Sequence, residues 1–529
     1  MKRSLLRSDR DGRGRRVPGR GRRRGLLDVE SLEVRSLLSN IFSDFTKALG
    51  HPDKHAQAAA PAHVQAPRPK FTFPPYSITA EISRNSDPAG DGNIFQQNVL
   101  VDGYAPSNST VWLAEGQRGY FTNVALADNT GHYAFLVPVP SGTSLLRVFA
   151  KNALQDYSNV ATVNVTYGNP IVAWDSIALR AIANDALAAP EAARDLAILH
   201  AAQYDAVAAV EFPRAAYQVH VVAPRGASAE AAADAAAVTV LDRLFPSQSR
   251  YFTEAMNAAR AGLPATRSVA DGLELGRQVA EATLAARASD GSALAVNYGT
   301  TGRGPVAPFV LASGSQFRPP APPTVGSPLY DQALEQVSAL GRVDSPSRTQ
   351  DQSDAAQFWN DGMGSFTNPG HWNEIAESLA VARKDTLARD ARLFAQLDFA
   401  LADAAIATWD AKATYNTPRP VAAIRPIDPT FTPLLSTPAD PSYVSGHAAY
   451  GAAAADVLSA SFGPHTAFTD RIFAVTGVTR TFPSLSAAAR QDADSRTWGG
   501  VAFKYDARAG LALGEQVGRY VRANFPRGK

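Results

Sequence analysis

Three short stretches near the C-terminus decide the fold that this chain is expected to adopt: K-A-T-Y-N-T-P-R-P (412–420), Y-V-S-G-H (443–447) and S-R-T-W-G-G-V-A-F-K-Y-D (495–506). They supply the cations Lys412, Arg419 and Arg496. Arginine offers a planar fork that binds two oxygens at once, whereas lysine is a compact point charge. Holding a tetrahedral anion out of water takes several fixed cations together with N–H and O–H donors. The three stretches therefore predict an oxyanion site.

The middle stretch is predicted to begin a helix. The residues after His447 are rich in alanine and end at Gly463-Pro464, which is a helix stop signal. Ser445 and Gly446 would then lie at a helix N-terminus, where free N–H groups and the positive end of the dipole favour an anion. A histidine at this place can exchange protons near neutral pH.

A purely structural interpretation of the same residues stays open. The S-G-H tripeptide could be only a helix cap, and the arginines could pair with Asp494 or Asp506. The order and spacing of the three stretches favour the site instead. They resemble the three-part signature of the vanadium-dependent haloperoxidase and type 2 phosphatidic acid phosphatase superfamily, which reads K-x6-R-P, P-S-G-H and S-R-x5-H.

Further stretches resemble the bacterial haloperoxidase-like branch of this superfamily. They are V-A-W-D-S-I-A-L-R-A-I from Val172, R-D-L-A-I-L-H-A-A-Q-Y-D-A-V from Arg194, S-Q-F-R-P-P-A-P-P from Ser315, D-S-P-S-R-T-Q-D-Q from Asp344, F-W-N-D-G from Phe358 and G-H-W-N from Gly370. The resemblance covers about residue 169 to the C-terminus. It implies a mainly α-helical bundle over residues 169–529.

The resemblance also implies a role for each matching residue. His447 matches the catalytic acid–base histidine of the family. The residues that would bind the oxygens of vanadate, or of phosphate as the alternative ligand, are Lys412, Arg419, Ser445, Gly446 and Arg496.

Three positions depart from the family pattern. Ala502 stands where the family has the histidine that ligates vanadium or, in the phosphatases, forms the phospho-histidine. Val444 replaces the signature proline, and Thr417-Pro418 replaces residues that are usually aromatic in haloperoxidase-like relatives. A methyl group has no lone pair for covalent catalysis. Changes in the outer shell of a metal site cost roughly 10–100-fold, so a missing ligand is expected to cost more.

Three functions compete for this sequence. The first is a haloperoxidase that binds vanadate and oxidises halide with hydrogen peroxide. The second is an acid phosphatase of the same fold that hydrolyses phosphomonoesters. The third is a degenerate member that binds oxyanions, or that only forms a stable helical domain outside the cell. Ala502 favours impaired chemistry. His371 and His465 could replace the lost ligand only if the fold brought them near; we expect a packing role for His371 and a surface position for His465.

Composition excludes several classes of protein. The 529 residues are enough for two or three domains. With no cysteine, the chain has no disulfide, zinc–thiolate site, iron–sulfur cluster or thiol nucleophile. The sequence contains no run of roughly 18 or more apolar residues, so we expect no membrane span. The main body, which is mildly acidic, shows no sign of a nucleic-acid partner. We expect a small-molecule substrate, and the family resemblance implies a possible homodimer.

Residues 1–70 are predicted to be a disordered export and linker segment. The first 24 residues hold eleven basic and two acidic side chains. The stretch L-E-V-R-S-L-L (32–38) resembles an L-E-P-R-x-L-L segment of exported planctomycete proteins, and it predicts a periplasmic, cell-surface or secreted location. The alternatives are a disordered basic tail or a nucleic-acid-binding arm. His51, His55 and His63 could bind a metal, but their irregular spacing in an alanine- and proline-rich tract favours a linker.

Residues 71–168 change to a period of two, which predicts β-strands. The alternating apolar residues are Val99, Val101, Val111, Leu113, Tyr133, Phe135, Val137, Val139, Leu146, Val148 and Ala150. Clusters of Gly, Pro, Asn and Asp separate the runs. The pattern is similar to that of bacterial immunoglobulin-like modules, so we expect a small β-sandwich with a role in spacing or adhesion.

Helical periodicity takes over from residue 169. We expect helices at 228–245, 331–340, 372–409 and 510–524, packed as a bundle with the oxyanion groups at helix ends. His200 falls on an apolar helical face and is predicted to be a satisfied core residue rather than a ligand. The proline-rich segment 302–328 is expected to cover one end of the pocket.

Overall fold

The computed structural model describes ten ranges of the chain: 77–82, 93–94, 98–115, 121–138, 142–152, 158–167, 169–292, 306–383, 385–471 and 479–526. The predicted basic head, the export segment and His51, His55 and His63 lie outside these residues. All of the described residues belong to one compact unit of the chain, Phe73–Lys529.

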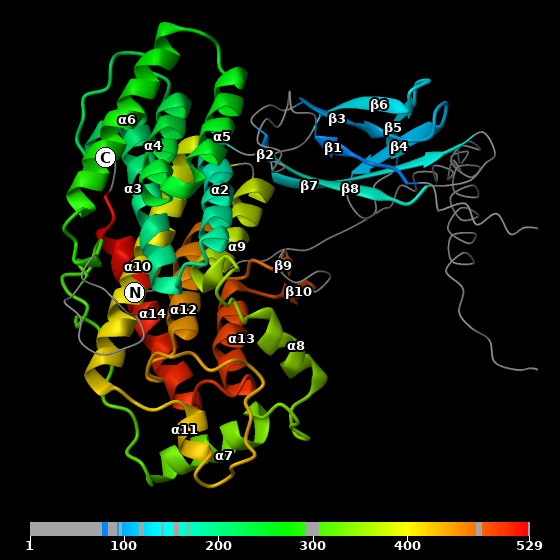
Figure 1. Cartoon of the computed structure of the whole chain (residues 1–529). Helices are drawn as coiled ribbons and strands as arrows, with labels where there is room; N and C mark the ends of the chain where they lie inside the picture. Colours follow the sequence, from blue (N-terminus) through cyan, green and yellow to red (C-terminus); the bar gives the residue numbers. More distant parts are fainter. Residues whose placement is uncertain are drawn as a thin grey trace, which may run out of the picture. The chain divides into compact units, whose positions relative to one another are not determined.

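Strands form the described part of the chain before residue 168 (Figure 1). Their bounds are β1 Glu81–Ile82, β2 Asn93–Ile94, β3 Asn98–Tyr104, β4 Thr110–Glu115, β5 Phe121–Leu126, β6 His132–Pro138, β7 Gly142–Lys151 and β8 Ala161–Tyr167. Within the described residues they make one sheet of order β1-β3-β6 and another of order β2-β8-β7-β4-β5. The pairing is antiparallel except between β2 and β8.

The alternating residues of these strands form a buried apolar cluster. Val99, Val101, Val111 and Leu113 are fully buried, while Leu136, which alternates with the buried positions of β6, is 66% exposed. Period two therefore identified the inward face correctly, because successive side chains of a strand point to opposite sides. Val139 lies outside the described residues. The immunoglobulin-like sandwich and the domain boundaries stay predictions.

The chain is mainly helical from Pro170 onward (Figure 1). The helices are α2 Pro170–Asn184, α3 Ala189–Glu211, α4 Ala229–Leu244, α5 Ser249–Gly262, α6 Arg267–Arg287, α7 Pro328–Gly341, α8 Gln350–Phe358, α9 Thr367–Arg383, α10 Leu387–Tyr415, α11 Pro420–Ile424, α12 Gly446–Phe462, α13 Leu485–Trp498 and α14 Lys504–Asn524. The strands β9 Phe468–Arg471 and β10 Thr479–Phe482 pair antiparallel between α12 and α13. Among the described residues, no helix has the length and apolar character needed to cross a membrane.

Most of the predicted helices are present. The segment 372–409 is almost wholly helical, as predicted, and divides into α9, which ends at Arg383, and α10, which begins at Leu387. Thr386 starts the new helix by accepting a hydrogen bond from the N–H of Arg389, and such a side-chain cap satisfies a backbone donor that a helix start leaves free. The last helix also begins earlier than predicted, at Lys504.

Helices α10, α12 and α14 pack side by side in the middle of the helical part (Figure 1). The approach of α12 to α14 depends on glycine, since a Cβ atom at Gly510 or Gly514 would collide with the carbonyl oxygen of Ser445 or Ala449. This seam fixes the position of the N-terminus of α12, where the predicted oxyanion groups begin.

The proline-rich segment that precedes α7 lies against the same region. Its residues 309–311 donate three backbone hydrogen bonds of 2.7–2.8 Å to the carboxylate of Asp403 in α10. Further on, the hydroxyl of Tyr415 donates to the carbonyl of Pro319 and that of Tyr443 to the carbonyl of Pro320. Tyr415 and Tyr443 belong to two of the three signature stretches, so the described part of the segment 302–328 contacts the neighbourhood of the predicted site.

Candidate functional site

Lys412 lies in the last turn of α10 and is buried, with 2% of its surface exposed. Its ammonium group donates to the carbonyl oxygens of Pro441 and Ser442. It also lies 2.8 Å from Oδ2 of Asp440. Burial lowers the pKa of Lys412 to about 8, although the charge of Asp440 acts in the opposite direction. The side chain is therefore a cation held in a site where a charge without a partner would be costly.

Arg419 immediately precedes α11 and reaches the same carboxylate. Its Nη2 lies 2.7 Å from Oδ2 of Asp440, its Nε donates to the carbonyl oxygen of Asp440, and its Nη1 donates to the carbonyl oxygen of Val501 at 2.8 Å. One oxygen of Asp440 is thus shared by Lys412 and Arg419. Burial acts to raise the pKa of Asp440, but the two cations outweigh it and hold that pKa below its ordinary value.

Ser445, Gly446 and His447 lie at the N-terminus of α12, which confirms the predicted helix start. Ser445 is the N-cap residue, with its hydroxyl accepting from the N–H of Ala448, and Gly446 is the first residue of the helix. The backbone N–H of Ser445 donates to the carbonyl of Asp506 in α14. The free N–H groups and the dipole of this helix end favour an anion.

His447 is held by a buried carboxylate. Its Nδ1 lies 3.0 Å from Oδ1 of Asp492, while the other oxygen of Asp492 accepts from Asn368 and Trp372. The acceptor at Nδ1 favours the tautomer with its proton there, which leaves the lone pair of Nε2 available for proton exchange. Burial lowers the pKa of His447, and the charge of Arg496 lowers it further.

Arg496 projects from α13 and is 5% exposed. Its Nη1 donates to the carbonyl oxygen of Trp359 at 3.3 Å. Burial lowers the pKa of Arg496 to about 10, and the positive charge of Arg419 also lowers it. The charge of Arg496 thus acts on His447, and the charge of Arg419 acts on Arg496.

Ala502 follows directly on a residue that Arg419 contacts. The N–H groups of Val501 and Ala502 donate to the carbonyl oxygen of Arg496 at 2.9 and 3.2 Å. Ala502 is 1% exposed. Residue 502 therefore lies in the loop beside the cations, but it offers only a methyl group.

Neither alternative histidine replaces the lost ligand: the nitrogens of His371 are occupied, and His465 follows the end of α12 that is opposite the site. His371 is buried, and its two ring nitrogens lie 3.1 Å from Asp361 and 2.9 Å from Asp470. Burial would lower the pKa of His371, but the two carboxylates outweigh this and raise it, so both nitrogens are protonated donors. His465 is exposed in the turn after α12.

The acidic partners of the site were not foreseen from the sequence. The expected alternative, in which the arginines pair with Asp494 or Asp506, is wrong: Asp494 pairs with Lys504, and Asp506 accepts from Ser442 and from the N–H of Phe503. The residues that do face the cations and His447 are Asp440 and Asp492. A signal for Asp492 was present, since it precedes Arg496 by four residues and so shares its helix face. Asp440 had no comparable local signal.

Comparison with known proteins gives this geometry a context. A family model described as the VCPO second helical-bundle domain matches residues 392–527, which include every predicted site residue. A solved bacterial vanadium-dependent iodoperoxidase is 25% identical, with a TM-score of 0.61, over 68% of this chain and 98% of that chain. The helical part has the fold of the vanadium-dependent haloperoxidases. None of the curated proteins matches the chain significantly.

The haloperoxidase-like fold extends to a second kind of relative. The holo and apo forms of a bacterial vanadium-dependent chloroperoxidase are each 16% identical, with TM-scores of 0.50 and 0.52. They cover 64% and 63% of this chain and 93% of each of those chains. These two matches show the fold alone, whereas the family model and the iodoperoxidase support the superfamily expected from the three signature stretches.

Proposed function

We propose that the helical part of this protein binds vanadate or phosphate without a covalent bond, and that any oxidation of halide by hydrogen peroxide is weak. The carrying observation is that Lys412 and Arg419 both bind one oxygen of Asp440. Two fixed cations are thus already arranged around a single anionic oxygen, and the charge of Arg419 also acts on Arg496. Ser445 and Gly446 would add the donors of a helix N-terminus.

The residues present fit an oxyanion that is held by charge and hydrogen bonds. They do not fit one bonded to a histidine at residue 502, since the methyl group of Ala502 has no lone pair and both nitrogens of His371 are taken by carboxylates. We therefore derive no turnover step through bound vanadate. His447 would hold and release a proton at Nε2, with Asp492 fixing its ring.

The absence of a histidine at residue 502 weighs equally against the acid phosphatase. That reaction needs a nucleophile to accept the phosphoryl group, and no described histidine near the cations is free to do so except His447. The better-supported alternative is a protein that binds an oxyanion without turning it over. A small-molecule ligand fits both the weakly active haloperoxidase and the protein that only binds an oxyanion. Export and a homodimer remain proposals that rest on family resemblance alone.

Calorimetric titration with vanadate and with phosphate, paired with bromination of monochlorodimedone, separates binding from chemistry. We expect binding of at least one of the two anions and little bromination. Arg496→Ala is expected to abolish binding, whereas Arg490→Ala, an exposed arginine of the same helix, serves as the matched control. A wild-type chain that binds neither anion would refute the site, and strong bromination would refute the impaired chemistry.

A further inference from the structure

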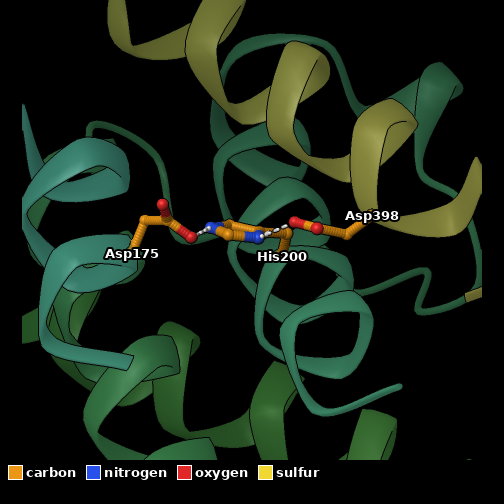
Figure 2. Close-up of side chains that lie close together, drawn as sticks. All are labelled: Asp175, His200 and Asp398. Atoms are coloured by element: carbon orange, nitrogen blue, oxygen red, sulfur yellow. Dashed lines mark hydrogen bonds and ion pairs between the residues drawn. The ribbon is translucent and has the colours of Figure 1, made fainter. Parts of the chain in front are cut away.

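A second cluster of charged side chains lies inside the helical bundle. Asp175 of α2, His200 of α3 and Asp398 of α10 are all fully buried. Figure 2 shows the imidazole ring of His200 between the two carboxylates. Their nearest oxygen and nitrogen atoms all lie within 4.8 Å of one another. The cluster needs an explanation, because buried ionisable groups are rarely retained without a partner or a ligand.

The side of His200 that faces Asp398 is fully bonded. Nδ1 of His200 lies 2.5 Å from Oδ2 of Asp398. The other oxygen of Asp398 accepts from the side-chain amide of Asn373 at 2.8 Å. This arrangement fixes the ring and keeps the proton on Nδ1, so the lone pair of Nε2 points toward Asp175. A carboxylate bonded to the far nitrogen of a histidine is the usual second layer of a metal site.

The side of His200 that faces Asp175 is not bonded in this way. Nε2 of His200 and Oδ1 of Asp175 are 3.6 Å apart, which is too long for a hydrogen bond. Nε2 and both oxygens of Asp175 are buried without a hydrogen-bond donor or acceptor in bonding geometry. Nearly all buried polar atoms in proteins are bonded. The carboxyl of Glu377 in α9 lies beside Asp175 and can share a hydrogen bond with it only if one of the two is protonated.

The 3.6 Å gap has the size of a metal bridge. Zinc bonds of about 2.0–2.2 Å to nitrogen and oxygen, at a near-tetrahedral angle, separate the two ligand atoms by about 3.3–3.6 Å. We propose that Nε2 of His200 and the two carboxylate oxygens of Asp175 bind one divalent transition-metal cation of the zinc class. Asp398 then acts as a positioning residue that orients His200.

The charge of the surroundings supports a cation. The carboxyl groups of Asp175 and Asp398 lie on either side of the imidazole of His200, and all three side chains are fully buried. A divalent ion would satisfy the unbonded atoms and offset this negative charge at once.

The sequence favoured a satisfied core histidine at residue 200, and that expectation holds for Nδ1 but not for Nε2.

The test uses the untagged full chain loaded with Zn²⁺ alone, dialysed and analysed for metal by mass spectrometry. We expect about one zinc per chain in the wild type and less than about a tenth of that in Asp175→Asn and His200→Gln. The matched control is Asp234→Asn, which removes another buried carboxylate, one bonded to Trp174, and leaves the cluster intact. Zinc should raise the melting temperature of the wild type and the control, but not of the two cluster variants.

A folded wild-type chain that retains no zinc, and whose melting temperature moves with neither Zn²⁺ nor Mn²⁺, overturns the proposal. Retention of zinc by Asp175→Asn and His200→Gln overturns it too, since the ion would then bind elsewhere, such as at His51, His55 and His63. If the two variants do not fold, the visible spectrum of the Co²⁺-loaded wild type decides between tetrahedral coordination by the cluster and loose binding. Arg496→Ala should keep its zinc, so failure of this site and failure of the oxyanion site are distinguishable.

Discussion

Asp440 places a single carboxylate oxygen 2.8 Å from the ammonium nitrogen of Lys412. The same oxygen lies 2.7 Å from the guanidinium of Arg419. The chain therefore provides its own anion to the cations of its candidate site. An external oxyanion that uses both cations has to compete with this carboxylate.

Asp440→Asn is expected to strengthen the binding of vanadate or phosphate. A hydrogen bond to a charged group is worth about 1.5–3 kcal/mol, so removal of the competitor should raise the affinity about 10- to 100-fold. Calorimetric titration measures this change. Without an anion the variant should melt at a lower temperature than the wild type, because it leaves two buried cations without a counter-charge. Asp344→Asn, which breaks an exposed pair with Arg342, should change neither quantity, and an unchanged or weaker affinity in Asp440→Asn would contradict the competition.

Ala502→His is expected to restore the missing ligand. The lone pair of the new imidazole would face the anion beside Arg419, and bromination of monochlorodimedone should rise by more than about 10-fold. Ala502→Leu adds bulk at the same buried position without a lone pair and should give no gain. A folded Ala502→His chain that binds vanadate yet gains no activity would locate the defect elsewhere, with Val444 and Pro418 the next positions to change.

His447 is expected to titrate below the ordinary histidine pKa of 6.5. Arg496→Met should raise its pKa, because a nearby positive charge is removed. Asp492→Asn should lower it, because the carboxylate that stabilises the imidazolium is lost. Nuclear magnetic resonance of a histidine-labelled chain can follow this, with the signal assigned through His447→Gln and exposed His465 as internal reference. A lowered pKa of His447 in Arg496→Met, or a raised one in Asp492→Asn, would contradict the electrostatics of the site.

Asp234→Asn is expected to remove a pH-dependent loss of stability. Burial raises the pKa of Asp234 from 3.8 to about 7, so the folded state binds this proton more tightly than the unfolded state does. The stabilisation is complete below pH 3.8 and is lost as the pH rises toward 7. The neutral amide avoids this loss, and the variant should be about 2–4 kcal/mol more stable than the wild type at pH 8 and similar to it at pH 4. Urea unfolding at the two pH values measures it; an equal difference at both would count against the burial argument.

Local patterns foretold the parts of this fold that depend on neighbouring residues. Alternation in 99–150 predicted which strand residues are buried, and the alanine-rich run after Gly446 predicted the start of α12. The break between α9 and α10 was missed because both segments have strong helical character. The side-chain cap at Thr386 was a weaker local signal than the surrounding helical pattern.

The candidate site was foreseen in its cations but not in its acids. Lys412, Arg419 and Arg496 stand at spacings that match a known signature, so their residue types were informative. Asp440 and Asp492 could be recognised as site residues only in the folded chain, where Asp440 lies within 3 Å of Lys412 and Asp492 within 3 Å of His447. The same holds for His200, whose unbonded nitrogen depends on the distance to a carboxylate on another helix.

The glycine seam between α12 and α14 has a mechanical consequence. Since the carbonyl of Ser445 lies against Gly510 without an intervening side chain, any sliding or tilting of the C-terminal helix is transmitted at once to the residue that caps α12. The position of Ser445 in the candidate site is thus coupled to the packing of the last helix. A small substitution on that helix, far along the sequence from the first two signature stretches, would change the position of Ser445 relative to an anion.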